Sequence, residues 1–263
     1  MLAHINLYNQ GMTQVAVKGQ IWSYQEIGGP ATPKAKAGEA IIILHGWGRS
    51  GNEWLRMAKD LSDWSGRKVY VLDLPGFGGS STPRLVKSIY DYSQLVVEFC
   101  KYLGLAKVIV IGHSLGGRVG IVMASHYSFM VEKLILVDPA GVKPKSIRRV
   151  LMRVLAKLFG WVPKSLRRKI ADYAMDEDYH NSPALQEMYL AIVKHDLRGE
   201  LSAIVCMTQL VWGEQDQILP LSLTKVYRKL LPQSRLRVVW GVGHDPHLTK
   251  YEQTLAILQE VCE

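Results

Sequence analysis

The segment IGHSLGGRVG, residues 111–120, is the stretch of this sequence that decides the fold. It follows a β-branched apolar run at residues 108–111 and continues into a small-residue pattern typical of a helix. A strand that turns sharply into a helix forces the turn residue into a strained backbone conformation, and flanking glycines let the strand and helix approach each other. Ser114 stands at this turn, which places its hydroxyl beside the unpaired N–H groups of the helix start. The pattern predicts a nucleophile elbow with Ser114 as the nucleophile.

Short apolar runs and helical patterns alternate along most of the chain. Apolar runs that are rich in β-branched residues predict parallel strands buried on both faces. They lie at residues 40–44, 69–72, 108–111, 134–137, 205–212 and 236–240. Helical patterns lie at residues 54–61, 90–103, 115–125, 221–231 and 249–261. This alternation predicts an α/β fold with a doubly wound, mostly parallel sheet of about eight strands, and residues 14–25 predict an antiparallel hairpin at its edge.

Residues 141–199 interrupt the alternation, because they carry helical patterns with no strand between them. Pro139, Gly141 and Gly199 mark turns at the borders of this segment. We therefore expect a core formed by residues 1–140 and 200–263, with residues 141–199 inserted into it as a helical lid. A chain of 263 residues is long enough for one domain with such an insertion.

A serine hydroxyl is a poor nucleophile without a neighbouring base, so a histidine and an acid that orients it are expected further along the chain. Asp216 follows the apolar run that ends at Trp212, and His244 follows the run that ends at Trp240. Both stand at the carboxyl ends of predicted strands, where open α/β sheets bind their ligands. The order serine, acid, histidine is the one that accompanies a nucleophile elbow. The sequence predicts Ser114, Asp216 and His244 as a catalytic triad.

Asp138 and His247 are alternatives to two members of this triad. Asp138 also follows a predicted strand, although its sequence Val-Asp-Pro is a common turn sequence as well. His247 lies three residues after His244, where a helix is expected to begin. Asp216 and His244 are preferred, the histidine because its flanking glycines place it at the tip of its loop. The alternatives stay open at this point.

The segment LHGWG, residues 44–48, follows another predicted strand and is rich in glycine. Glycine lets a backbone approach the substrate closely, so the Trp47 and Leu115 N–H groups are the expected donors of an oxyanion hole. The segment DLPGFGGS, residues 73–80, is interpreted mainly as a structural loop that frames the site.

Six motifs together resemble the α/β-hydrolase superfamily, in its branch of lid-bearing serine esterases and C–C-bond hydrolases: HGWG, DLPGFGGS, GHSLGG, VDPAG, WGEQDQILP and GVGHDPH. The resemblance covers residues 15–263 apart from the interior of the insertion. It implies Ser114 as nucleophile, His244 as base and acid, and Asp216 as the residue that orients it. It also implies Trp47 and Leu115 as oxyanion donors. Dehalogenases and epoxide hydrolases of the superfamily carry aspartate at the nucleophile position, so Ser114 argues against both.

The resemblance implies a serine hydrolase, and a carboxylesterase acting through an acyl-enzyme on an ester of short to medium acyl chain is the first expectation. A C–C-bond hydrolase or a thioesterase is the alternative, although Asp245 stands where C–C hydrolases often carry an aromatic residue. A ligand-binding protein that keeps the fold without the chemistry is the alternative of another class. The intact order of the triad argues against it.

Composition narrows the class of protein further. No apolar run approaches the ~18 residues that cross a bilayer, and residues 1–20 lack a signal-peptide pattern, which predicts a cytoplasmic protein. The three cysteines lie far apart in the sequence, which argues against a disulfide framework or a zinc pair. Zinc-binding histidine spacing, EF-hand patterns and phosphate loops are absent from the sequence, so no metal or cofactor is expected.

The net charge of +9 comes from one segment. Residues 141–170 contain ten Lys or Arg and no acid, and the remaining 22 basic residues nearly balance the 23 acidic ones. The segment is compatible with a solvated face, with contact to an anionic membrane surface, or with attraction of an acidic small substrate. Nucleic acid is not an expected partner, because Phe159 and Trp161 are the segment's only aromatic residues. The expected partner is a small ester, and the sequence makes no prediction of the oligomeric state.

Overall fold

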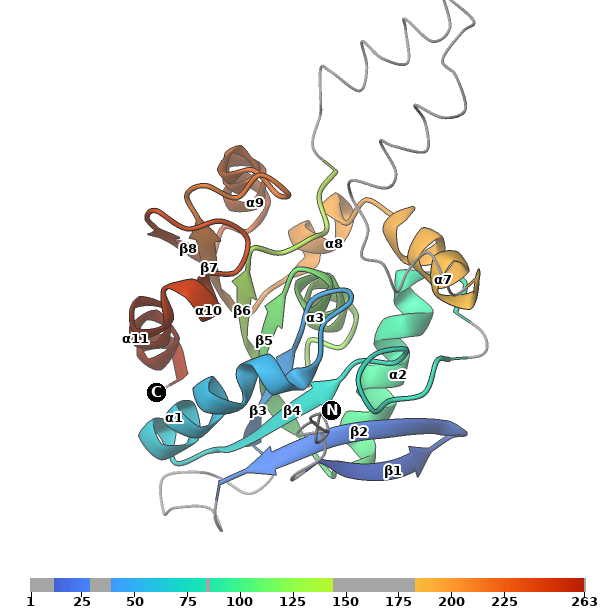
Figure 1. Cartoon of the computed structure of the whole chain (residues 1–263). Coiled ribbons are helices and arrows are strands. Elements are labelled where there is room, and N and C mark those ends of the chain that lie inside the picture. Colours follow the sequence, from blue (N-terminus) through green and yellow to red (C-terminus); the bar gives the residue numbers. More distant parts are fainter. Residues whose placement is uncertain (1–11, 29–38, 84–85, 144–182, 263) are drawn as a thin grey trace, which may run out of the picture.

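The computed structural model describes residues 12–28, 39–83, 86–143 and 183–262 of the chain. The strands of these residues form one sheet in the order β1-β2-β4-β3-β5-β6-β7-β8 (Figure 1). Their bounds are β1 Thr13–Val17, β2 Gln20–Ile27, β3 Glu39–Leu44, β4 Lys68–Asp73, β5 Lys107–His113, β6 Val131–Val137, β7 Met207–Gly213 and β8 Ser234–Val239. All pairs from β4 across to β8 are parallel, whereas β2 is antiparallel to both β1 and β4. The predicted mostly parallel sheet and its antiparallel edge hairpin are confirmed.

Helices cover both faces of the sheet because its central strands are apolar on both sides. Successive residues of a strand point to opposite faces, so Ile42 and Leu44 pack into one core, and Ile41 and Ile43 into the other. The first core is covered by α2 Ile89–Tyr102, α3 Leu115–His126, α7 Pro183–Val193, α8 Arg198–Ala203 and α9 Thr224–Leu230. The second is covered by α1 Leu55–Ser65 and α11 Tyr251–Cys262, the latter preceded by the short α10 Pro246–Thr249 (Figure 1).

Local sequence explains where several helices begin and end. Ser88 begins α2, because its side chain accepts a hydrogen bond from the Asp91 N–H. Gly66 ends α1 in the left-handed conformation, with φ +67°, which glycine adopts without a steric cost. α3 begins directly at the end of β5, so Ser114 lies between the strand and the helix, as the sequence predicts.

Some apolar residues of the predicted strands lie outside the observed ones. Val205 precedes β7 and Trp240 follows β8, and each side chain is 66% exposed. β8 is the edge strand, and its side chains alternate between exposed and partly buried positions. The expectation of burial on both faces is wrong for β8, because one of its faces carries Arg235 and Arg237 and is exposed to solvent.

The interior of the expected lid, residues 144–182, lies outside the described residues. The division into a core of residues 1–140 and 200–263 and a lid of residues 141–199 therefore stays a prediction. The described part of this segment includes α7 and the start of α8, and Met188 and Ile192 of α7 are buried in the first core. No described helix has the length and apolar character needed to cross a membrane.

Candidate active site

Ser114 adopts a strained backbone conformation at the turn from β5 to α3. Its φ of +50° and ψ of −108° lie in a region that side-chain-bearing residues rarely occupy. Three backbone hydrogen bonds hold it there. Its N–H donates to the Val137 carbonyl at 3.1 Å, and its carbonyl accepts from the N–H groups of Arg118 at 3.2 Å and Ala140 at 3.0 Å. Such strain persists only where the surroundings impose it, and it often marks a functional residue.

The glycines of the elbow are needed for close packing. A Cβ atom on Gly116 would lie 2.0 Å from the Leu44 carbonyl oxygen, and one on Gly112 would lie 2.4 Å from the Gly116 oxygen. The absence of side chains thus lets α3 pack directly against β3 and β5. The Gly116 N–H donates to the His45 carbonyl at 3.1 Å and joins the helix start to the loop after β3.

Asp216 and His244 meet at the ends of two neighbouring strands. The Asp216 carboxylate and the His244 ring are 2.7 Å apart, from Oδ2 to Nδ1. The other oxygen of Asp216 accepts from the backbone N–H groups of Ile218 and Leu219, each at 2.8 Å. Because a carboxylate can only accept, His244 carries its proton on Nδ1 and leaves Nε2 free to accept one. The structure therefore orients His244 as a general base requires.

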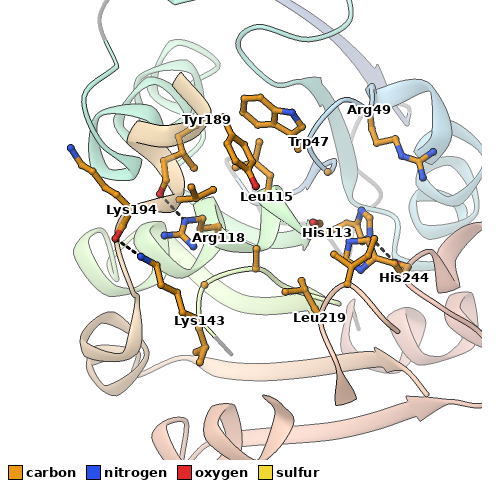
Figure 2. Close-up of a pocket in the computed structure, with 18 of the residues that line it drawn as sticks. Trp47, Arg49, His113, Leu115, Arg118, Lys143, Tyr189, Lys194, Leu219 and His244 are labelled. Carbon is orange, nitrogen blue, oxygen red and sulfur yellow. Dashed lines mark hydrogen bonds between the residues drawn. The ribbon is translucent and has the colours of Figure 1, made fainter. Parts of the chain in front are cut away.

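Ser114 and His244 line the same cavity, which has a volume of about 660 Å³. Trp47 and Leu115 line it as well, and Figure 2 shows Trp47, Leu115 and His244 around its interior. Within the described part of the chain, the Ser114 hydroxyl has no hydrogen-bond partner. In unliganded enzymes the contact between nucleophile and base is often loose and tightens when substrate binds.

The loop that carries Trp47 is held by His45. The Leu74 N–H donates to His45 Nε2 at 2.9 Å, so His45 Nδ1 carries the proton and donates to the Gly46 carbonyl at 2.7 Å. Burial lowers the pKa of His45, which favours this neutral ring. Leu115 is the first residue of α3, and its N–H has no acceptor among the described residues, as an oxyanion donor requires.

Asp73 confirms the structural interpretation of the loop at residues 73–80. Its carboxylate accepts from the Gly51 N–H with one oxygen and from the Gly79 N–H with the other, both at 2.8 Å. Its backbone carbonyl accepts from the Ser80 hydroxyl at 2.7 Å. Asp73 thus joins two loops at the edge of the site.

Asp138 lies fully buried at the end of β6, beside Asp216. One of its oxygens accepts from the Gly213 N–H at 3.0 Å, and the other has no hydrogen-bond partner among the described residues. Burial and the negative charge of Asp216 raise the pKa of Asp138 to about 9. At neutral pH Asp138 is therefore a protonated acid, and its proton satisfies the second oxygen by donation to Asp216.

His247 lies apart from the cavity. Its ring stacks on Trp54 with centroids 4.1 Å apart, and its Nε2 is 3.5 Å from the Glu53 carboxylate. It is buried in α10 and does not line the cavity. The structure thus places His244, and not His247, in the lining of the cavity that Ser114 also lines.

Two groups of side chains in the described residues bring enough donor atoms together for a metal ion: Asp138 with Asp216 and His244, and Glu53 with His113 and His247. In the first group the Asp216 oxygens are already engaged within the protein, by the Ile218 and Leu219 N–H groups and by the His244 ring. In the second group His113 lines the cavity, His247 is buried and Glu53 is half-buried. Its charges fit an ion pair between Glu53 and His247 as well as a cation.

A family model described as the alpha/beta hydrolase fold matches residues 39–182, which is more than half of the chain. The chain belongs to this family. Lipase 3 of Moraxella sp. (strain TA144) is 26% identical over 82% of this chain and 75% of its own length. The pimeloyl-[acyl-carrier protein] methyl ester esterase of Vibrio cholerae is 24% identical over 86% of this chain and 94% of its own. A crystal structure of a membrane phospholipase A superposes with a TM-score of 0.75, 25% identity and coverage of 95% of this chain and 84% of that one.

Two residues of the site have positions that the sequence interpretation missed. His113 donates from Nε2 to the His244 carbonyl at 2.9 Å and so supports the loop that carries the base. Burial, followed by the neighbouring His247 and His244, lowers the pKa of His113, which keeps its ring neutral. Arg118 lies buried in the cavity wall. Both stand inside the elbow motif, so their closeness to Ser114 in sequence was the available signal.

Proposed function

We propose that this protein is a serine hydrolase that cleaves carboxylic esters of short to medium acyl chain. The observation that carries the proposal is the Asp216–His244 hydrogen bond at the mouth of the cavity that Ser114 also lines. Ser114 is the proposed nucleophile, His244 the proposed base and Asp216 the proposed orienting acid. Trp47 and Leu115 are the proposed oxyanion donors.

The proposed reaction proceeds through an acyl-enzyme. The Ser114 Oγ attacks the ester carbonyl while His244 Nε2 takes the hydroxyl proton. The carbonyl oxygen becomes an oxyanion, which the Trp47 and Leu115 N–H groups stabilise. The C–O bond then breaks, and the alcohol leaves with the proton from His244. Water attacks the acyl group with His244 again as the base, and the carboxylic acid is released as Ser114 regains its proton.

Family membership and the relatives support an ester as the substrate. Relatives that this chain matches over most of its length are named lipases, a monoacylglycerol lipase and a methyl ester esterase. The apolar part of the cavity wall supports an acyl chain as the bound group, since it includes Leu115, Val142, Ile192 and Leu219. A volume of about 660 Å³ suits a small ester.

A C–C-bond hydrolase is the second candidate, but the site favours it less. Meta-cleavage product hydrolases superpose on this chain at 19% identity, which shows the shared fold alone. Asp245 follows His244 and forms an ion pair with Arg49 at 2.9 Å. This position therefore holds a charged residue engaged with the protein instead of an aromatic surface for a substrate.

A fluorophosphonate probe followed by mass spectrometry tests the chemistry. We expect one label, on the peptide that contains Ser114, and none on the Ser114→Ala variant or on heat-denatured protein. A folded wild-type protein that stays unlabelled would contradict the enzyme proposal and favour a binding protein on the same fold. A panel of p-nitrophenyl esters of graded length then tests the substrate class. Labelling of Ser114 with no turnover of any ester would point to C–C-bond hydrolysis.

A further inference from the structure

The wall of the cavity away from His244 is cationic. Arg118, Lys143 and Lys194 line it, and Figure 2 shows the three side chains grouped on the opposite side of the cavity from His244. The acidic side chain in the described lining is Asp245, which forms its ion pair with Arg49. The described lining thus carries four basic side chains and one acidic side chain, with no acid opposite the group at Arg118.

Arg118 is the buried member of this group, with 4% of its surface exposed. Its Nε–H donates to the Ile192 carbonyl at 3.1 Å, and its Nη2–H donates to the His195 carbonyl. Both acceptors are neutral. Among the described residues, no carboxylate lies within the 4.0 Å of an ion pair with Arg118, and the nearby Asp196 is bonded to Arg198 instead.

A guanidinium that is buried without a counter-ion is costly, and a buried charge is normally paired. Arginine stays charged in proteins, because its ordinary pKa lies above 12, far from neutral pH. Burial lowers the pKa of Arg118, which expresses the same cost. On the same wall, the Lys143 ammonium donates to the Lys194 carbonyl at 2.7 Å and adds a further positive charge to the cavity lining. Among the described residues this counter-charge is missing, and a ligand that enters the cavity can supply it.

We propose that Arg118 and Lys143 form an anion subsite, and that the preferred substrate is an ester whose acyl chain ends in a carboxylate. This inference rests on the proposed function, which supplies the ester bond at Ser114. Arg118 lies four residues after Ser114, a rise of about 6 Å along α3, and both residues line the same cavity, so the proposed acyl chain is a short one. The planar guanidinium matches a carboxylate in geometry and charge.

A purely structural role is the competing explanation, because Arg118 also caps the carboxyl end of α7 through the Ile192 and His195 carbonyls. The two roles differ in what they predict. Loss of a cap weakens the fold and lowers the turnover of every substrate. Loss of an anion subsite lowers the turnover of carboxylated esters and leaves neutral esters unaffected.

The test compares two p-nitrophenyl esters of equal chain length, the monoester of adipic acid and the hexanoate. We expect wild-type kcat/KM to be higher for the adipate monoester, and the ratio of the two to fall at least about tenfold in Arg118→Gln, by the loss of one charge-assisted hydrogen-bonding pair. Arg118→Lys should retain part of the preference. Equal losses on both esters, or a wild-type preference for the hexanoate, would overturn the subsite.

Lys143→Gln covers the case in which Arg118→Gln fails to fold, because the Lys143 side chain is exposed and, among the described residues, bonds to one carbonyl. We expect it to lower the same ratio severalfold. Lys107→Gln is the matched control, since Lys107 begins β5 at the opposite end of the sheet and is exposed. An equal effect of Lys107→Gln would mean that the preference comes from the overall positive charge of the protein, and it would overturn the subsite.

Inhibition by the free acids distinguishes the kind of anion. Adipate should inhibit hexanoate hydrolysis more strongly than inorganic phosphate does, and Lys143→Gln should weaken inhibition by adipate. Stronger inhibition by phosphate would indicate that the subsite binds a phosphoryl group and not a carboxylate, and it would overturn the proposed substrate. Fluorophosphonate labelling of Ser114 in each variant separates this outcome from a failure of the proposed function, because labelling does not require the anion subsite.

Discussion

Asp138 and Asp216 are both buried aspartates at the ends of neighbouring strands, yet the structure gives them different roles. Asp216 accepts from His244 and from two backbone N–H groups, which suits a carboxylate. Asp138 has one such donor, the Gly213 N–H, and it faces the charge of Asp216. The first environment stabilises a negative charge and the second opposes one.

The triad proposal predicts a ranking of single substitutions. Ser114→Ala and His244→Ala should each lower kcat by several orders of magnitude, because the members of such a unit fail together. Asp216→Asn should lower kcat by about 10⁴-fold if the Asp216 carboxylate sets the tautomer of His244. His247→Ala should have a milder effect than His244→Ala. Steady-state kinetics with p-nitrophenyl butyrate, with thermal unfolding as the control for folding, measure the ranking. A larger loss for Asp138→Asn than for Asp216→Asn would mean that Asp138, and not Asp216, is the acid that orients the histidine.

Asp138 should also make stability depend on pH. Its folded-state pKa of about 9 lies above the value of about 3.9 in an unfolded chain. Between these values the folded protein keeps a proton that the unfolded chain releases, so its stability falls by about 1.4 kcal/mol per pH unit. The stability that the proton on Asp138 contributes to the fold is complete below about pH 3.9 and is lost as the pH rises through about 9.

Asp138→Asn removes this dependence because the amide imitates the neutral carboxyl and still donates to Asp216. Urea unfolding at about pH 5 and about pH 8 should therefore show the variant gaining stability relative to the wild type as the pH rises. Parallel pH profiles for the two proteins would mean that Asp138 is ionised in the folded state.

At the scale of the elements, α3 depends on its approach to β3. Gly116→Ala places a methyl group 2.0 Å from the Leu44 carbonyl oxygen, which is backbone and has no room to move aside. We expect a large loss of stability, of about the 1 to 3 kcal/mol typical of overpacking or more. Thermal unfolding measured by circular dichroism is the assay.

Gly199→Ala is the matched control for that substitution. Gly199 also lies in a helix, α8, but an added Cβ meets nothing within 4 Å. This variant should be unchanged or more stable by about 0.5–1 kcal/mol, because alanine loses less conformational freedom in a helix. Similar melting temperatures for the two variants would show that the close contact of α3 with β3 relaxes without cost.

At the scale of the whole molecule, the charge is concentrated in the expected lid. Residues 141–170 carry ten Lys or Arg and no acid, and most of them lie outside the described residues. Charges concentrated in one segment attract an anionic partner through a field that salt weakens, with a Debye length of about 8 Å at physiological ionic strength. We propose that this segment contacts an anionic membrane surface.

The membrane proposal predicts binding to phosphatidylglycerol vesicles and not to phosphatidylcholine vesicles. Each lost Lys or Arg should weaken binding by about 1 kcal/mol, so replacement of Arg148, Arg149 and Arg153 by Gln should weaken it by about 3 kcal/mol. Vesicle sedimentation measures the binding. Hydrolysis of a neutral ester should survive the triple change, because the triad residues lie at the ends of the sheet strands. Equal binding to both kinds of vesicle, or none to either, would contradict a role for these charges at membranes.

The sequence by itself determined the features that depend on residues close together in the chain. Apolar runs predicted the strands, and the glycines around Ser114 predicted the turn into α3, because local sterics and periodicity act over a few residues. The same patterns placed Asp216 and His244 at strand ends in the right order. These patterns did not show that β8 lies at the edge of the sheet, because the sequence of a strand does not specify which strands lie beside it.

Only the tertiary structure decided which of the candidate residues meet. The bond from His113 to the His244 carbonyl joins positions 131 residues apart, and the bonds of Arg118 join positions 74 and 77 residues apart. The protonated state of Asp138 depends on Asp216, which approaches it from the next strand of the sheet. Charge and hydrogen bonding act through space, so their balance at a site is settled only when the fold has brought distant segments together.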